Sequence, residues 1–429
     1  MKYRLVFALS SRDRTEQRRT AILAPNMKIL LLAPQPFYQE RGTPIAVRLA
    51  AEVLAGRSDD SVTLMTYHEG ADVSIPNVTH KRVIPYPRVS EIQPGFSLKK
   101  LYTDCFFFIS LLAELWRNRS DQYQLIHAVE ESVFMALFVK FVAGIPYIYD
   151  MDSSLSLQVV EKMPWCKYFH PLFQFFEKRA IKNSIAVVPV CDALAALAES
   201  GGSRKIMILR DISLLDYDQK EHEGRTEPML RTEAGLSEDA KIILYVGNLE
   251  KYQGIDLLVE SFAKIWKNAP DAHLVVIGGI EEHILKYQRR SETLGVPKDR
   301  SHFLGPRPVA HLAAYLQQAD ILTSPRVLGN NTPMKIYSYI HCGKPLLATN
   351  LPTHSQVLDN NVALLCEPTP EAFSKGLIRL LADEMLRERL AKAAYLLAEE
   401  KYTFEVFSRR LNELYDRVGY KVQAIAAHA

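Results

Sequence analysis

Short runs of apolar residues alternate along most of the chain with longer stretches in which apolar residues recur at helical spacing. Amphipathic stretches such as Pro44–Ala55 and Tyr168–Lys182 are expected to form helices. In the first half, the runs expected to form buried strands are Lys28–Ala33, Val62–Thr66, His80–Ile84, Gln124–His127, Pro146–Asp150, Ile185–Val190 and Lys205–Leu209. Apolar strands that alternate with helices are typical of a parallel sheet covered on both faces.

A polar stretch between residues 210 and 240 interrupts this pattern, and the alternation then starts again. We expect two Rossmann-like, doubly wound domains, 27–209 and 241–402, joined by a linker at 210–240. A C-terminal helix (Phe404–Val418) and tail occupy 403–429. Further strands are expected at Ile242–Val246, His273–Ile277, His302–Leu304, Asp320–Thr323, Leu346–Thr349 and Ala363–Cys366. Because open parallel sheets bind ligands at the carboxyl ends of their strands, the site residues should follow strands and face a cleft between the domains.

Residues 1–26 differ in charge from the rest of the chain. They hold six Lys or Arg and two Asp or Glu, so the remaining residues sum to a net charge of −1 although the whole chain carries +3. We interpret this segment as an N-terminal extension, either a disordered tail or an overlong start, and keep open a targeting or membrane-surface role. The nearly neutral remainder does not indicate a nucleic-acid partner.

The five cysteines are scattered without a CxxC pair, which predicts neither a zinc site nor a disulfide framework. We therefore expect a cytoplasmic protein, with the inner face of the membrane as a second location. The apolar stripe Cys105–Phe108, with Leu98, Leu101 and Leu112, is expected to form helix core. A groove that faces an acceptor or a membrane is the alternative, because Lys99 and Lys100 flank the stripe.

The loop after the first strand carries Gly42 and Thr43, which would face the sugar or the acceptor. A glycine lets the backbone approach a ligand, and Thr43 can cap the next helix, with Pro44 at its first position. A plain strand-to-helix turn is the alternative. The loop lacks the GxGxxG pattern of nicotinamide sites.

Polar side chains also follow two later strands of the first domain. His127 and Glu130 lie at the end of one, and Asp152 follows the next. We take these three residues as the catalytic candidates. Asp150-x-Asp152 matches a short DxD metal motif, but so short a match is weak support, and we expect no metal and no cofactor.

Two loops of the second domain have the residue types of a phosphate site. The first runs from Gly247 to Gly254 and opens a helix, and its donor-binding candidates are Gly247, Asn248, Glu250, Lys251 and Gln253. The second precedes the expected helix Met334–His341, with Thr332 as N-cap, and its candidates are Arg326, Asn330, Asn331, Thr332, Lys335 and Ser338. Free helix amides beside an arginine and a lysine suit a diphosphate. A glycine-rich turn and a capped structural helix are the alternatives.

These loops, in this order and over residues 27–420, resemble the group 1 (family 4) glycosyltransferases of the GT-B fold, most specifically at 241–350. The resemblance implies a nucleotide sugar bound by the second domain and an acceptor bound by the first. It also implies transfer with retention and without a metal, and a C-terminal helix that crosses back to the first domain.

The chain departs from the family pattern at several positions. The usual Arg and Lys that clamp the diphosphate would fall on Asn248 and Gln253, and the usual Glu-x7-Glu pair on Asn330 and Ser338. A common histidine would fall on Asp152. These changes indicate either a variant subgroup that uses Arg326, Lys335 and Lys251 for the phosphates, or lost activity.

The sequence therefore predicts a glycosyltransferase with a nucleotide-diphosphate sugar as donor and a saccharide or lipid-linked acceptor, with peripheral membrane contact as a further expectation. Arg326 and Lys335 would neutralise the leaving diphosphate. Two alternatives stay open: a nucleotide-sugar epimerase of the same fold, and a catalytically degenerate protein that binds nucleotide sugars.

Overall fold

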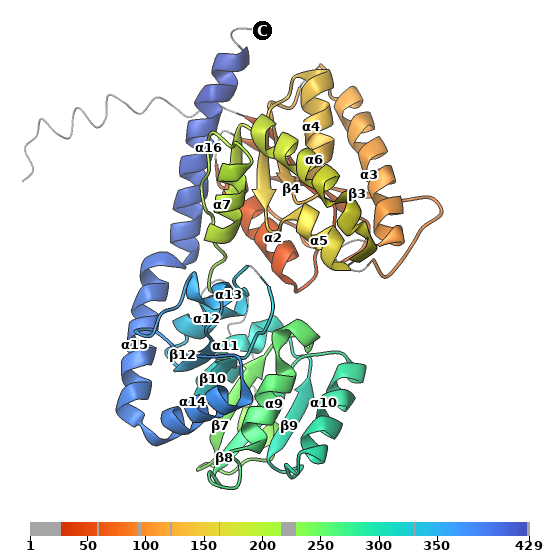
Figure 1. The fold of residues 1–429 in the computed structure, drawn as a ribbon. Helices are drawn as coiled ribbons and strands as arrows, with labels where there is room; N and C mark the ends of the chain where they lie inside the picture. The colour runs from red at the N-terminus through yellow and green to blue at the C-terminus, as the bar shows by residue number, and fades with distance from the viewer. Residues whose placement is uncertain are drawn as a thin grey trace, which may run out of the picture.

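The computed structural model describes residues 27–57, 60–92, 97–120, 122–162, 164–215, 229–329 and 331–426. The extension 1–26, part of the expected linker and Asn330 lie outside the described residues. The described chain forms two α/β units, one above the other, and the long C-terminal helix Phe404–Ala426 runs alongside the first (Figure 1).

The first unit contains a parallel six-stranded sheet in the order β3-β2-β1-β4-β5-β6. Its strands are β1 (Lys28–Ala33), β2 (Ser61–Tyr67), β3 (Val78–Val83), β4 (Leu125–Val129), β5 (Tyr147–Met151) and β6 (Ala186–Pro189). In the central register Ile29 lies opposite both Val62 and Leu125. Both faces of β1 are buried, which is why it appears in the sequence as a continuous apolar run.

Helices cover both faces of this sheet. The helical segments are α2 (Gly42–Ala55), α3 (Leu98–Arg117), α4 (Ser132–Ala143), α5 (Leu155–Lys162), η1 (Pro164–Phe169), α6 (His170–Asn183) and α7 (Asp192–Ser200). Leu31 and its face pack against α2 and the C-terminal helix, whereas Leu30 and Leu32 pack on the other face with residues of α3, α4 and α6. The expected strand Lys205–Leu209 is wrong, because only Ile206 forms a bridge, to Val187 of β6, although Leu209 also donates a backbone hydrogen bond to Pro189.

The second unit repeats the same winding. Its sheet has the order β12-β11-β10-β7-β8-β9. The strands are β7 (Lys241–Val246), β8 (Ala272–Ile277), β9 (Ser301–Gly305), β10 (Ile321–Ser324), β11 (Leu346–Thr349) and β12 (Leu364–Cys366). The helical segments are α8 (Leu230–Glu233), η3 (Lys251–Gln253), α9 (Ile255–Ala263), α10 (Glu281–Thr293), η4 (Val309–His311), α11 (Leu312–Gln317), α12 (Lys335–His341), α13 (Pro352–Ser355), α14 (Pro370–Ala382) and α15 (Glu384–Lys401).

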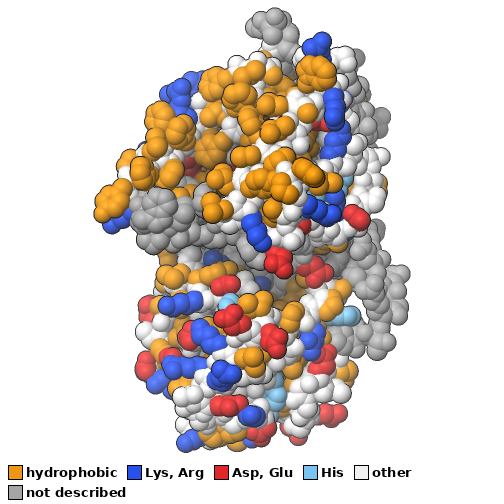
Figure 2. Space-filling view, turned by 90° about the vertical axis from the view of Figure 1, so that its right-hand side faces the viewer, with side chains coloured by type: hydrophobic (Ala, Val, Ile, Leu, Met, Phe, Trp, Pro, Cys, Tyr) orange, Lys and Arg blue, Asp and Glu red, His pale blue; other side chains and the backbone are white. Residues whose placement is uncertain are grey.

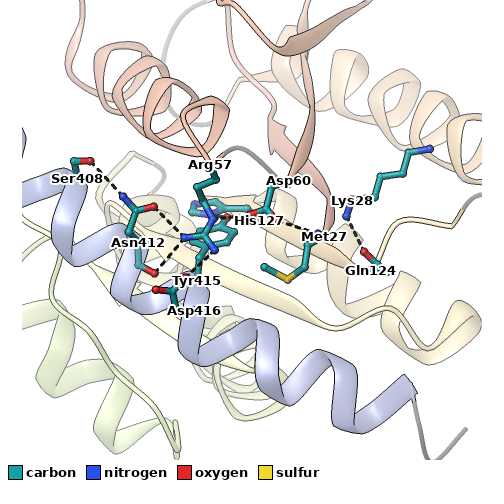
Figure 3. A network of polar contacts seen from close by, with 10 residues as sticks. All are labelled: Met27, Lys28, Arg57, Asp60, Gln124, His127, Ser408, Asn412, Tyr415 and Asp416. Atoms are coloured by element: carbon teal, nitrogen blue, oxygen red, sulfur yellow. Dashed lines mark hydrogen bonds and ion pairs between the residues drawn. The ribbon is translucent and has the colours of Figure 1, made fainter. Parts of the chain in front are cut away.

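The last helix, α16 (Phe404–Ala426), packs on the first unit, which confirms the expected crossover. Its Leu411 and Leu414 are fully buried against the core formed by β1 and α2. Polar contacts add to this anchorage (Figure 3): Arg57, after α2, donates to Asp416 at 2.8 Å and to the side chain of Asn412 at 3.0 Å. The helix is therefore held by both apolar and charged contacts.

The carboxyl-end loops of the two sheets contact each other. Glu40, between β1 and α2, accepts a hydrogen bond from the backbone of Val309, which follows β9. Gln356, after α13, accepts one from the backbone of Ala193 at the start of α7. The ligand-binding edges that this winding creates in each unit therefore face each other.

Candidate active site

Glycines allow three loops of the second unit to meet at the carboxyl ends of β7, β8 and β10. Gly254 has φ +74°, and a Cβ there would lie 1.9 Å from the carbonyl oxygen of Pro325. Gly278 has φ +111°, and a Cβ there would lie 2.2 Å from the carbonyl oxygen of Gly247. Larger residues cannot occupy these two positions without moving backbone. Sequence reasoning missed Gly278 and its neighbour Gly279, although a glycine pair directly after a strand was visible.

Lys335, the first residue of α12, extends its ammonium group into this loop cluster. Its Nζ lies 3.2 Å from Oε1 of Gln253 and 3.8 Å from the ring centroid of Tyr245. It is also 3.2 Å from where a Cβ on Gly247 would be. Burial, and to a smaller extent the nearby Arg326, lowers the pKa of Lys335 well below that of an ordinary lysine. An anion bound beside it would reverse this shift.

Arg326 is held by the loop that follows β10. Its Nε donates to the carbonyl oxygen of Leu328 at 2.7 Å and its Nη2 to Oδ1 of Asn331 at 3.2 Å. The guanidinium also lies over the ring of Tyr252. Burial lowers the pKa of Arg326 as well. The structure thus brings the two predicted cations to one place.

The remaining predicted residues of the first donor loop differ in what they contact. The Asn248 side chain accepts from the backbone of Glu250 at 3.2 Å, and its carbonyl oxygen accepts from Tyr245. Asn248 therefore stabilises the loop. Glu250 and Lys251 are exposed, and their contacts to a donor stay predictions.

The start of α12 differs from the sequence-based expectation. The helix begins at Lys335 with Met334 as N-cap, so the expected N-cap role of Thr332 is wrong. The carbonyl oxygen of Asn331 is instead held by Thr353, at 2.7 Å. The Ser338 hydroxyl accepts from the backbone of Leu214 at 3.1 Å, so it contacts the segment between the units. Its contact with a donor stays a prediction.

The facing edge of the first unit is acidic. Glu130 follows β4 with φ +49°, and burial, with a contribution from the charge of Glu131, raises its pKa to about 7. Burial, together with Asp150 and Glu130, raises the pKa of Asp152 well above its ordinary value, although a hydrogen bond with Thr43 opposes this. A carboxyl whose pKa lies near neutral pH, as that of Glu130 does, is suited to proton transfer. The structure therefore places Thr43 beside Asp152.

His127 lies behind this edge. It is fully buried in β4, where Nε2 lies 3.0 Å from Oδ2 of Asp150 and Nδ1 lies 2.7 Å from the hydroxyl of Tyr415 in α16 (Figure 3). His127 therefore connects the crossover helix to β5. Its catalytic role stays a prediction. Gly42 is exposed with open space around its Cβ position, so its approach to a ligand also stays a prediction.

Further charged groups lie at the acidic edge that sequence reasoning did not assign to the site. Lys100 of α3 forms an ion pair with Glu131, and Asp104 accepts a hydrogen bond from Tyr67. Burial raises the pKa of Asp104 to about 7 and likewise that of Asp211. The spacing of Lys100 and Asp104, one helical turn apart, was the available signal.

Within the described part of the chain, no three His, Cys, Asp or Glu side chains are grouped so that they could hold a metal ion. None of the described helices combines the length and apolar content that a membrane span requires.

Comparison with known proteins identifies the second unit. Residues 227–397 match the family model described as glycosyl transferases group 1. The second unit is a group 1 glycosyltransferase domain. This domain contains both cation-bearing loops, and the sequence resemblance to this family is thereby confirmed.

Curated glycosyltransferases match part of the chain. The D-inositol 3-phosphate glycosyltransferase of Corynebacterium glutamicum is 28% identical over 195 residues, 43% of this chain and 46% of the relative. The phosphatidyl-myo-inositol mannosyltransferase of Mycobacterium leprae is 28% identical over 196 residues, 44% of this chain and 51% of the relative. The chain thus spans about half the length of these curated relatives.

Solved structures extend the similarity to both units. Sucrose-phosphate synthase from Thermosynechococcus elongatus superposes with a TM-score of 0.70 at 19% identity, covering 91% of this chain and 99% of that one. The HepE protein of Anabaena in complex with UDP-glucose has a TM-score of 0.67 at 16% identity, covering 90% and 99%. The chain has the GT-B fold, as expected from the sequence.

Proposed function

We propose that this chain transfers a sugar from a nucleotide-diphosphate donor to a saccharide or lipid-linked acceptor, with retention of configuration and without a metal. The observation that carries the proposal is the meeting of Arg326 and Lys335 with the glycine loops at the carboxyl edge of a group 1 glycosyltransferase domain. The family resemblance implies retention, and it implies that the donor binds the second unit and the acceptor the first. The scattered cysteines support a cytoplasmic location, including the inner face of the membrane.

The leaving diphosphate would lie beside the two cations. Negative charge grows on the β-phosphate oxygen as the sugar–phosphate bond breaks, and fixed cations in a partly buried site stabilise that charge. The bound diphosphate would raise the pKa of Lys335 again, because the anion offsets the burial that lowers it. The acceptor hydroxyl would bind at the facing edge, where the ionised form of Asp152 or Glu130 takes up its proton.

A donor screen with an acceptor-independent readout tests this proposal. The protein is incubated with UDP-, GDP- and ADP-sugars, and release of nucleoside diphosphate is measured. UDP-glucose comes first, because a protein of similar fold has been solved with it. We expect release of nucleoside diphosphate with at least one donor. A changed sugar still attached to its nucleotide would instead indicate epimerisation, and binding without turnover would indicate a degenerate protein.

Metal independence has its own test. We expect that EDTA leaves turnover within twofold of the untreated enzyme, because the described carboxylates do not form a metal-binding group. Loss of turnover with EDTA, restored by Mg²⁺ or Mn²⁺, would contradict this part and would point to Asp150 and Asp152.

A further inference from the structure

The outer surface of α3, α4 and α6 exposes large apolar side chains. The exposed fraction is 69% for Trp116, 63% for Phe141 and 57% for Phe175. Figure 2 shows these side chain types gathered over the first unit, whereas the second unit has a mixed surface. We call this surface the apolar face, and its members include Ile109, Trp116, Phe138, Phe141, Phe175 and Phe176. Monomeric soluble proteins rarely expose so much contiguous apolar surface without a function for it.

The three helices form one continuous layer. The rings of Phe108 and Phe138 meet edge to face at 5.3 Å between α3 and α4. Nζ of Lys140 donates to the carbonyl oxygen of Asn183 at 2.5 Å and joins α4 to α6. On the inner side Phe107 and Leu111 of α3 are fully buried, so the expected core role is right for the centre of the stripe. For Leu98, Leu101, Cys105 and Leu112 it is wrong, because these residues are exposed.

The exposed charges on the helices that bear the apolar face are of one sign. Acidic side chains of these helices point inward: Glu114 pairs with Lys81 at 2.6 Å, and Glu177 accepts from the hydroxyl of Ser156 at 2.6 Å. Within residues 97–120, 132–143 and 167–183, every exposed charged side chain that the structure describes is basic. They are Lys99, Arg117, Arg119, Lys167, Lys178, Arg179 and Lys182.

We propose that the apolar face binds the surface of a lipid bilayer that contains anionic phospholipids, with α3, α4 and α6 lying in the membrane interface. Aromatic side chains surrounded by lysine and arginine match the composition of helices that lie in this interface. The basic residues would pair with the phosphate groups of the lipids. A symmetric contact with a second copy is disfavoured, because it would bring two basic rims together.

Helix α3, which bears part of the apolar face, also reaches the candidate active site. The start of α3 lies beside the loop after β1, because Nζ of Lys100 donates to the carbonyl oxygen of Pro34 at 3.2 Å. If the bilayer lies against α3, an acceptor held in it is close to the loops that face the glycosyltransferase domain. This consequence rests on the proposed function, whereas membrane binding itself does not.

Vesicle sedimentation tests the binding without any turnover. The full chain is mixed with vesicles of phosphatidylcholine, alone or with about a third of phosphatidylglycerol. We expect binding to the anionic vesicles only. The double variant Phe141→Glu/Phe175→Glu should reduce the bound fraction about tenfold or more, because it places carboxylates where side chains enter the interface. The triple variant Lys178→Glu/Arg179→Glu/Lys182→Glu should reduce the bound fraction by a similar factor. Because salt screens this electrostatic contribution, the difference between this variant and the wild type should disappear at high salt.

Matched substitutions on the second unit serve as controls. Met385→Glu/Leu396→Glu also exchanges exposed apolar residues, and Arg289→Glu/Arg389→Glu/Lys392→Glu exchanges exposed basic ones. These variants should bind vesicles like the wild type, and melting temperatures confirm that each variant folds. Absence of wild-type binding, or equal loss in the controls, would overturn the proposal. So would a dimer in size-exclusion chromatography that Phe141→Glu/Phe175→Glu dissociates while vesicles remain unbound.

Discussion

The two sheets have the same strand order, yet the loops at the carboxyl ends of their strands carry side chains of opposite type, basic in one unit and acidic in the other. The edge of the second unit presents Arg326 and Lys335, whereas that of the first presents Glu130 and Asp152. Burial favours the uncharged form of each group, so it lowers the pKa of Lys335 and raises the pKa of the carboxyls. The shared topology therefore determines where the ligand sites lie, and the side chains determine which ligand each edge binds. A diphosphate suits the basic edge, and a neutral hydroxyl that must lose a proton suits the acidic one.

The largest expected effect concerns the acidic edge. Asp152→Asn keeps the shape of the side chain but removes its ability to take up a proton. Because general base catalysis typically contributes about 100-fold or more, we expect kcat to fall by at least about that factor, with the donor KM nearly unchanged. Steady-state kinetics measures both. Asp72→Asn, at a fully exposed side chain of the same unit, is the control. A kcat within twofold of the wild type would show that this edge does no chemistry.

The basic edge is tested by Lys335→Ala. We expect kcat/KM to fall roughly ten- to a few-hundred-fold, since a charge-assisted contact of this type contributes about 1.5–3 kcal/mol. Donor affinity should fall too, because the diphosphate is already charged before transfer. The thermal stability of the ligand-free variant should not fall, because burying an amine is itself unfavourable. Lys267→Ala, at an exposed lysine, is the control. Turnover like that of the wild type would place the phosphate site elsewhere.

Protonation of Lys335 provides a second test of whether the diphosphate binds at the basic edge. The free enzyme has a lowered lysine pKa and the diphosphate complex a higher one, so binding takes up a proton between these two values. Affinity for nucleoside diphosphate should therefore fall as the pH rises through that window. Calorimetry in buffers of different ionisation enthalpy measures the proton uptake. Uptake that persists in Lys335→Ala would assign it to another group.

The strands were predictable to a degree that the site was not. The bounds of β1 and β11 agree with those expected from the sequence, because fully buried parallel strands leave apolar runs of the right length. The start of α12 was not predictable, because its preceding loop is fixed by Thr353, far along the chain. The loop residues were found from glycines and charges alone. Their partners were not, since a contact such as Lys335 with Gln253 joins residues from different loops.

A smaller effect is expected on stability at the acidic edge. The pKa of Glu130 is about 7 in the folded protein, against an ordinary value of 4.5. The folded state therefore binds more protons than the unfolded state between these values, so this contribution to stability is complete below pH 4.5 and is lost as the pH rises through 7. We therefore expect the free energy of unfolding of Glu130→Gln, relative to that of the wild type, to be larger at pH 8 than at pH 5, by on the order of 1 kcal/mol. Chemical denaturation at both pH values measures this, with exposed Glu388→Gln as control. An equal difference at both pH values would show that Glu130 ionises normally.

The smallest effect is expected from removing residues 1–26, which supply neither edge in our interpretation. The described fold is already anchored at Met27, whose side chain is 1% exposed and whose backbone nitrogen donates to Asp60 at 2.8 Å. A chain that begins at Met27 would keep this contact with an ammonium group in place of the amide, so the melting temperature should change by no more than about 2 °C. Binding to anionic vesicles should also persist, because we assign it to the apolar face. A fall of several degrees would show that the segment packs on the fold. Loss of vesicle binding in the shortened chain, with its melting temperature unchanged, would instead assign the membrane contact to the basic extension.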